Sequence, residues 1–271
     1  AEAAETVPFN LVPVALPAPG AYQAGTPNNA TVTIAQNGFL VTTTNDSGAG
    51  SLRQAVANAN ALPGTDTITF SDGTDGTVNF TDATLDTITL TSGELTLATD
   101  IIVSGSAANR VAVASNGTSR VFQVNPGTTV RLVGLTITGG GVVQRGAGVM
   151  NRGTLLVLGC AITNNTASGA NSGGGGLSSG DLGESGAVTT VVNSTFSGNS
   201  AGLGGGANTR SGNSLTLINC TFSGNTATPN SGGAVYVGGA TTILNSTLSG
   251  NFTSFRGGAI ATDGATVTLA N

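Results

Sequence analysis

The clearest pattern along the chain is an alternation of aliphatic and hydroxyl residues. In Thr87–Thr91 and Leu215–Ile218, for example, Ile or Leu recurs at every second position with Thr between. Successive side chains of a β-strand point to opposite faces, so this alternation predicts strands with one apolar and one polar face. Because the pattern recurs over most of the chain, we expect an all-β protein.

A second pattern is a repeat of 26 residues in the last part of the chain. The phrase Asn-Ser/Cys-Thr-Phe/Leu-Ser-Gly-Asn occupies Asn193–Asn199, Asn219–Asn225 and Asn245–Asn251, and one further period leads to Asn271. A fixed period of roughly 20 to 50 residues is typical of stacked repeat architectures. The repeat therefore predicts a solenoid whose core lies between neighbouring turns.

Each repeat is expected to supply three short strands to one turn of a parallel β-helix. One strand follows a Gly-Gly pair, one resembles Leu215–Ile218, and one resembles Cys220–Phe222. A coil lets each strand pair with its counterpart one turn later, without crossover helices. Asn tolerates the left-handed conformation at a corner and can bond along its own column, while Gly-Gly permits positive φ at the opposite corner. The expected columns are Asn193, Asn219, Asn245 and Asn271 at the corner, and Phe196, Phe222 and Leu248 inside.

The repeat is clearest over residues 146–271, where one turn is longer than the others. Ile162 and Phe196 are 34 residues apart, against 26 from Phe196 to Phe222. We expect the additional residues to form a loop around Ser178–Ser185, which carries Asp181 and Glu184.

Three segments are expected in the chain: residues 1–37, 38–65 and 66–271. Residues 66–271 form the continuous coil. In the first part of the chain the expected strands are Thr31–Ile34, Phe39–Thr43, Asp66–Phe70, Thr77–Phe80, Leu95–Leu97, Ile101–Val103, Val111–Val113, Arg120–Val124 and Val130–Val133. Residues 1–37 are rich in Pro and Ala, and they are interpreted as the last strands of a β-sandwich, a linker, or strands laid along the coil.

Residues 38–65 are expected to close the start of the coil with one short amphipathic helix. Ser51 and Gln54 have the spacing of a capping box, and Pro63-Gly64 ends the helical pattern. One helical face carries Leu52, Ala55, Val56, Ala59 and Leu62. Such a helix would shield the open edge of the first turn.

The composition narrows the function classes. Charged residues make up 8% of the chain, His is absent, every basic residue is Arg, and the net charge is −5. The chain has no basic cluster, so we expect no nucleic acid partner. It also has no run of about 18 apolar residues, so we expect no transmembrane helix.

Cys160 and Cys220 fall in one column two turns apart. The distance between them is then about 9–10 Å, which is too far for a disulfide. We therefore expect two free, buried thiols.

Candidate chemistry is sparse. From residue 126 onward the acids are Asp181, Glu184 and Asp263, and no His or Lys is present as a base, so we expect no catalytic residues and no cofactor. The less favoured alternative is a carbohydrate-active enzyme, because some β-helices are enzymes of this class.

Asp72 and Asp75, which lie in an Asp-Gly turn, are weak candidates for Ca²⁺ ligands. The alternative is that this turn is simply exposed to solvent. Arg53 is interpreted as pairing with a backbone carbonyl at the end of the coil, or as a surface residue.

Two stretches resemble a known family. Phe39–Ala55, which contains Gly50-Ser-Leu-Arg-Gln-Ala, and Pro63–Phe70 are similar to the start of bacterial right-handed parallel β-helix surface proteins with a Cys-Ser-Leu-Arg-Glu-Ala signature, with Gly50 and Gln54 replacing the Cys and Glu. The Gly-Gly-Ala and Phe-x-x-Asn phrases resemble repeats of polymorphic outer-membrane proteins. The tract that includes Ala4–Val7, Gly20–Tyr22 and Asn29–Ile34 is similar to the closing strands of Calx-β sandwiches.

This resemblance implies a secreted or surface-displayed protein with an adhesive or structural role and no reaction. We therefore expect a non-catalytic extracellular β-helix, a fragment of a larger surface protein, whose partners are glycans or a host or neighbouring cell surface. The alternative is a self-assembling filament unit in which copies of the chain pair end to end, because an open end turn is a template for another chain.

Overall fold

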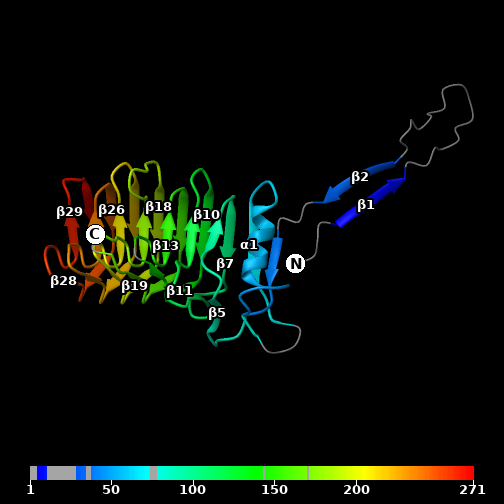
Figure 1. The fold of residues 1–271 in the computed structure, drawn as a ribbon, viewed down its shortest axis with the longest axis horizontal. Helices are drawn as coiled ribbons and strands as arrows, with labels where there is room; N and C mark the ends of the chain where they lie inside the picture. Colours follow the sequence, from blue (N-terminus) through cyan, green and yellow to red (C-terminus); the bar gives the residue numbers. More distant parts are fainter. Residues whose placement is uncertain (1–4, 11–28, 35–37, 74–77, 143, 170) are drawn as a thin grey trace, which may run out of the picture.

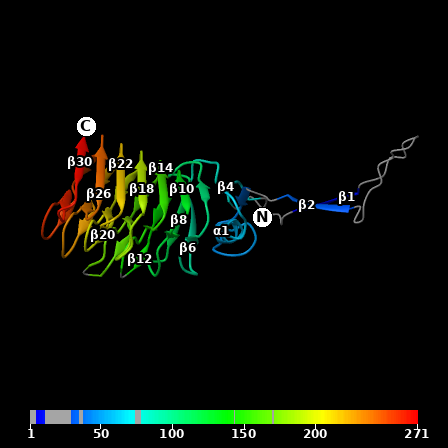
Figure 2. The ribbon, with the colours of Figure 1, turned by 90° about the horizontal axis from the view of Figure 1, so that it is seen from above.

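The computed structural model describes residues 5–10, 29–34, 38–73, 78–142, 144–169 and 171–271. From residue 38 onward the chain winds into a parallel β-solenoid, whose turns stack along one axis from α1 to β28 and β29 (Figure 1). The parallel β-helix expected from the sequence is confirmed. The turned view places the long strands of the first sheet along one side and β12 and β20 along another (Figure 2).

The first sheet follows the solenoid over its whole described length and holds nine parallel strands. Its strands, in order, are β3 (Gly38–Val41), β4 (Asp66–Phe70), β7 (Ile101–Ser104), β10 (Thr129–Val133), β14 (Thr154–Leu158), β18 (Val188–Val192), β22 (Ser214–Ile218), β26 (Ala240–Leu244) and β30 (Val267–Ala270).

The second sheet has seven parallel strands, which follow the first-sheet strands in each turn. They are β5 (Asp86–Leu90), β8 (Val111–Ser115), β11 (Thr136–Thr138), β15 (Ala161–Thr163), β19 (Thr195–Ser197), β23 (Thr221–Ser223) and β27 (Thr247–Ser249).

The third sheet has seven parallel strands and follows the glycine-rich corner. They are β6 (Leu95–Leu97), β9 (Phe122–Val124), β13 (Val149–Asn151), β17 (Leu177–Ser179), β21 (Ala207–Thr209), β25 (Val235–Val237) and β29 (Ile260–Thr262).

A fourth, five-stranded sheet adds to the three strands that the sequence predicts for each turn. Its two-residue strands are β12 (Gly141–Val142), β16 (Thr166–Ala167), β20 (Ser200–Ala201), β24 (Thr226–Ala227) and β28 (Phe252–Thr253). Two residues are too short to give an alternating hydrophobic pattern, so the sequence pattern does not reveal them.

The core is a set of apolar columns inside the coil. The inward residues of paired strands repeat at the same register, as with Leu132, Val157 and Leu217, all fully buried. At the glycine-rich corner, Gly204 adopts φ +61°, and a Cβ there would lie 2.0 Å from the carbonyl oxygen of Ala207. Glycine is therefore required at this corner, as the sequence predicts.

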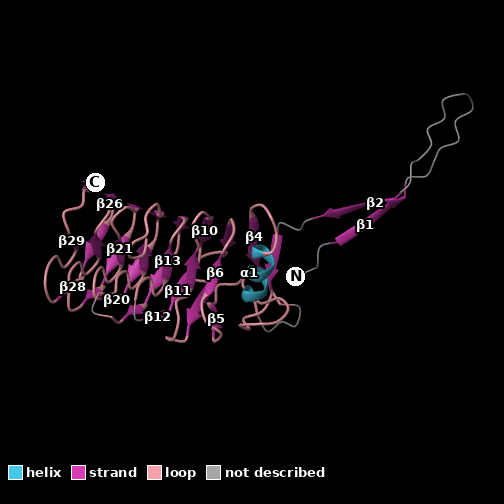
Figure 3. Ribbon diagram, turned by 45° about the horizontal axis from the view of Figure 1, so that its top comes forward, coloured by secondary structure: helices cyan, strands magenta, loops and turns pink. Residues whose placement is uncertain are grey.

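The helix α1 (Leu52–Asn60) lies at the start of the solenoid, where it contacts β3, β4 and β6 (Figure 3). It buries Leu52, Ala55, Val56 and Ala59 in the main core, as predicted. Ser51 caps it by accepting the N–H of Gln54 at 3.2 Å. The coil itself begins before the helix, because β3 already pairs in parallel with β4.

Two details of the sequence prediction are wrong. Thr77–Phe80 is not a strand in its described residues, 78–80; Phe80 packs edge-on against Phe70, with ring centroids 5.3 Å apart. The additional residues of the long turn do not form one loop around Ser178–Ser185, because Leu177–Ser179 is the regular strand β17. Residues 168–176 and 180–187, on either side of β17, are each four residues longer than the equivalent loops one turn later.

The described part of residues 1–37 is one antiparallel pair of strands. β1 (Glu5–Asn10) pairs with β2 (Asn29–Ile34), with Glu5 opposite Ile34. The tracts Ala4 and Gly20–Tyr22, used for the sandwich resemblance, lie outside the described residues.

Candidate functional site

The repeated asparagines form two columns with different environments. Asn193, Asn219 and Asn245 adopt φ of 50°, 52° and 47° and are the expected left-handed corners. Along this column, Asn219 donates from Nδ2 to Oδ1 of Asn193 at 3.2 Å, on the exposed surface. Asn271 follows β30 in the register of Asn245.

The buried, continuous ladder lies six residues further on in each repeat. Its members are Asn165, Asn199, Asn225 and Asn251. Each of the first three donates its backbone N–H and its Nδ2 to Oδ1 of the next, at 2.9–3.1 Å. Nδ2 also bonds a main-chain carbonyl of the preceding turn. In the sequence, Asn199, Asn225 and Asn251 stand at the end of the repeated phrase, and their common period of 26 residues was the signal for this ladder.

The predicted interior column is present. The rings of Phe196 and Phe222 stack with centroids 4.4 Å apart and planes 5° from parallel. Leu248 pairs in register with Phe222 and is partly buried against the core. The side chains of this column therefore pack against one another in the core.

Both cysteines are free and buried, as predicted, and they also donate hydrogen bonds. Cys160 Sγ lies 3.4 Å from the carbonyl oxygen of Leu132, and Cys220 Sγ lies 3.3 Å from that of Ile218. Ser194, between them in the column, bonds the carbonyl of Val192 in the same way. Burial raises the pKa of the Cys160 thiol to about 11, so this thiol is not poised as a nucleophile.

The Ca²⁺ candidates are only partly described. Asp72 is exposed and accepts hydrogen bonds from the hydroxyl and N–H of Thr81, whereas Asp75 lies outside the described residues. Among the described residues, no group of three or more Cys, Asp or Glu side chains could hold a metal ion.

Arg53 joins the start of the coil to the turn between β5 and β6. Its guanidinium donates to the carbonyls of Gly93 and Glu94 at 2.6 and 3.2 Å, and to Oδ1 of Asp46 at 2.8 Å. The carbonyl pairing expected from the sequence is thus present, with a carboxylate partner in addition.

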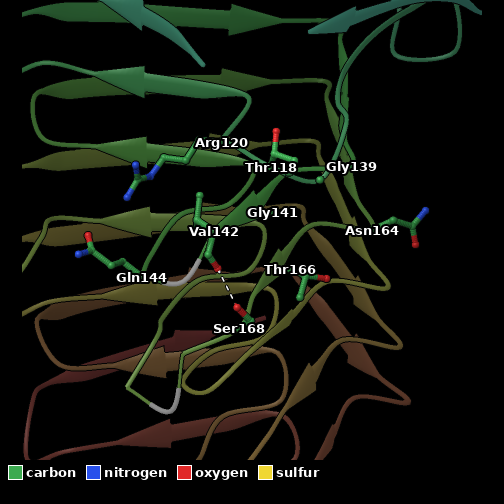
Figure 4. Close-up of a pocket in the computed structure, with 11 residues that line it drawn as sticks. Thr118, Arg120, Gly139, Gly141, Val142, Gln144, Asn164, Thr166 and Ser168 are labelled. Carbon is green, nitrogen blue, oxygen red and sulfur yellow. Dashed lines mark hydrogen bonds between the residues drawn. The ribbon is translucent and has the colours of Figure 1, made fainter. Parts of the chain in front are cut away.

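A cleft that no sequence pattern predicts lies beside the first strands of the fourth sheet (Figure 4). It has a volume of about 700 Å³ and draws its lining from three successive turns. In Figure 4, Arg120 and Gln144 lie on one side and Asn164 on the other, with Val142 and Thr166 between them. The remaining lining residues are Gly117, Thr118, Gly139, Gly140, Gly141 and Ser168.

Glycines shape the wall of this cleft. A Cβ on Gly141 would lie 2.1 Å from the carbonyl oxygen of Gly117, and one on Gly140 would lie 1.9 Å from that of Ala147. The main chain therefore approaches closely here, between adjacent turns at Gly141 and within one turn at Gly140, and peptide groups form part of the lining. Ser168 donates from Oγ to the carbonyl of Val142 at 3.3 Å, which ties β12 to the following turn.

The positive group of the cleft is held in place. Arg120 donates from Nε to the carbonyl of Arg145 at 2.8 Å, and its Nη1 lies 3.2 Å from Oε2 of Glu94. A guanidinium carries five N–H donors, so these two bonds leave others able to contact a ligand. The described lining of the cleft thus consists of hydroxyls, amides, glycine backbone, one isopropyl group and one guanidinium.

A cluster of charges lies beside the cleft, around the two long loops. Asp181 bonds Arg152 at 2.7 Å and lies 3.5 Å from Arg145, whose side chain is 5% exposed. Arg152 also lies 3.3 Å from Glu184. Burial alone raises the pKa of Asp181, but the Leu182 N–H and Arg152 outweigh it and lower that pKa. Asp181 is therefore an ionised partner of two arginines.

No helix among the described residues has the length and hydropathy needed to cross a membrane. The chain matches no protein-family model, no curated protein and no solved structure. From residue 38 onward, the described residues form an all-β parallel solenoid with one short helix near its start.

Proposed function

We propose that the chain is a non-catalytic, extracellular or surface-displayed β-helix that binds a glycan along the cleft of the fourth sheet. The observation that carries the proposal is the lining of this cleft. It offers hydroxyl, amide and backbone groups together with one guanidinium already paired with Glu94. Such a surface matches the many hydroxyls of a sugar chain, each of which both donates and accepts hydrogen bonds.

The size and rigidity of the cleft support this proposal. Its volume of about 700 Å³ lies within the range of about 300–1,000 Å³ for ligand sites. The strands that border it are fixed by parallel pairing and by the buried asparagine ladder, so little ordering would be needed on binding. Repeated display of weak sites would give adhesion through multivalency.

A binding experiment tests the proposal. The chain is applied to an array of neutral and acidic oligosaccharides and compared with its Thr166→Arg variant, which places a bulky cation in the cleft. The control is Thr221→Arg, which changes another exposed threonine at the start of a strand, here in the second sheet. We expect Thr166→Arg to lose most of the retention of extended oligosaccharides and Thr221→Arg to preserve it. Equal retention by Thr166→Arg, or no retained glycan at all, would contradict the proposal.

The non-catalytic part needs its own measurement. Any glycan retained on the array is incubated with the chain and Ca²⁺, and new reducing ends and unsaturated products are measured. We expect the glycan to stay intact. Turnover that disappears in Asp181→Asn would instead establish a carbohydrate-active enzyme.

Surface location is tested on intact cells of the source organism. An antibody against the solenoid should label cells before permeabilisation. Labelling only after permeabilisation would contradict an extracellular or surface-displayed protein.

A further inference from the structure

A second hollow lies on the outer face of the third sheet, away from the cleft of the proposed function. It has a volume of about 420 Å³ and receives residues from three turns, including Leu203, Tyr236 and Asp263. Tyr236 is the middle residue of β25, and its neighbours Val235 and Val237 are buried in the core, so the Tyr236 side chain faces outward by alternation.

An exposed aromatic ring borders this hollow. Phe255 is 65% exposed, whereas Phe39, Phe80, Phe122, Phe196 and Phe222 are buried. The guanidinium of Arg256 lies 4.8 Å from the centroid of the Phe255 ring. Together with the Tyr236 and Ile260 side chains, which line the same hollow, the Phe255 ring gives it an apolar wall.

Polar groups of both charges accompany the ring. The hydroxyl of Tyr236 donates a hydrogen bond to the carboxylate of Asp263. Burial, followed by the nearby Asp263 charge and this hydrogen bond, raises the pKa of Tyr236, while Arg210 opposes the rise. The carboxylate is thereby held at the hollow and retains lone pairs for other donors. Arg256 supplies donors on the same border.

We propose that this hollow is a second saccharide site, which takes a single neutral sugar ring. The C–H face of the ring packs on Phe255, and vicinal hydroxyls bond the carboxylate of Asp263 and the guanidinium of Arg256. The two opposite charges offer acceptors and donors together, which suits hydroxyls better than a net charge. The hydroxyl of Tyr236 contacts the same ring.

This inference stands apart from the cleft of the fourth sheet, because the two lining sets share no residue. It predicts a terminal-sugar contact, whereas the cleft is proposed to hold an extended chain. The Thr166→Arg variant should therefore leave this second site intact, and each proposal can fail without the other.

The chain offers a built-in reporter for the test. It contains two tyrosines, Tyr22 and Tyr236, and no tryptophan, so Tyr22→Phe leaves Tyr236 as the only tyrosine fluorophore. Methyl glycosides of neutral hexoses, N-acetylhexosamines and uronic acids are titrated into this variant and followed by tyrosine fluorescence and saturation-transfer NMR. We expect a saturable signal from a neutral sugar and a weaker one from the uronic acid.

Two substitutions and a matched control assign the signal. In the same background, Phe255→Ala and Asp263→Asn should each weaken binding at least tenfold. Phe252→Ala removes a second exposed phenylalanine of the same turn, which is 59% exposed and does not line the hollow, and it should leave the affinity unchanged. The proposal is overturned by a panel with no saturable ligand, by full binding in Phe255→Ala, or by equal losses in Phe255→Ala and Phe252→Ala.

Discussion

Asn199 donates two hydrogen bonds to a single atom of Asn225, one full turn later. Its backbone N–H and Nδ2 lie 3.1 and 2.9 Å from Oδ1 of Asn225. Both residues are fully buried, and Nδ2 of Asn225 continues the ladder to Asn251 and to the carbonyl of Phe196. The ladder thus supplies buried polar partners at a corner where strand pairing is interrupted.

Replacing Asn225 by Ala should be among the more destabilising single changes in the coil. It leaves the N–H and Nδ2 of Asn199 without their shared acceptor and removes the bond to the Phe196 carbonyl. Since each unsatisfied buried group costs about 1–3 kcal/mol, we expect a loss of about 3–5 kcal/mol, measured by urea unfolding.

The control for the ladder is Asn219→Gly, in the exposed asparagine column of the same turn. Glycine accepts the positive φ of this corner and loses only a surface hydrogen bond, so the change should stay below about 1 kcal/mol. If Asn225→Ala and Asn219→Gly lowered the free energy of unfolding equally, the buried ladder would stabilise the fold no more than the exposed column does.

The phenylalanine stack should tolerate leucine better than alanine. Leu248 already occupies the position equivalent to Phe222 one turn later, so Phe222→Leu keeps an interior side chain and should cost about 1 kcal/mol. Phe222→Ala opens a cavity beside Phe196 and should cost about 3–5 kcal/mol. Urea unfolding midpoints distinguish these values, and a milder effect for Ala than for Leu would contradict the packing assignment.

The two thiols should resist modification in the folded protein and accept serine in their place. Both are buried with raised pKa, so a thiol reagent at pH 8 should label them only after unfolding. Cys220→Ser should change stability by less than about 1.5 kcal/mol, because Ser194 and Ser246 already bond main-chain carbonyls in this column. Rapid labelling of the native chain would contradict this.

The fold could be predicted because its strongest signals are local and repeated. The period fixes which residues share a column, so the Phe196–Phe222 contact and the separation of Cys160 from Cys220 follow directly. The period cannot say which asparagine column points inward, because Asn219 and Asn225 have the same spacing. Their environments depend on corner geometry, including the positive φ of Gly224, which periodicity does not encode.

The cleft and the second hollow could not be predicted from the sequence either, because periodicity does not encode the geometry that forms them. Each draws side chains from three turns, and its shape depends on loops whose lengths differ between turns. Thr166 or Gln144 carries no chemical signal in a chain rich in polar residues. Phe255 was similarly unremarkable in the sequence, because its exposure is settled only by the position of the loop between β28 and β29.

Acid should weaken the junction between the start of the coil and the next turns through Asp46. Burial alone would raise the pKa of this carboxyl, but hydrogen bonds from Ser92, Arg53 and Thr91 outweigh it and lower the pKa to about 2. The unfolded value is about 3.9, so the stabilisation is complete above about pH 4 and disappears as pH falls toward 2. Allowing for solvent screening, we expect a contribution of about 1–2 kcal/mol.

The measurement is the urea unfolding midpoint between pH 5 and pH 2 for three proteins. Asp46→Asn should start lower at pH 5 and fall less steeply than the native chain, because its side chain cannot gain a proton and no longer pairs with the Arg53 charge. Asp72→Asn removes an exposed carboxylate near the same end of the coil and should retain the native slope. If Asp46→Asn and the native chain lose stability in parallel, the Asp46–Arg53 junction does not set the acid limit of the fold.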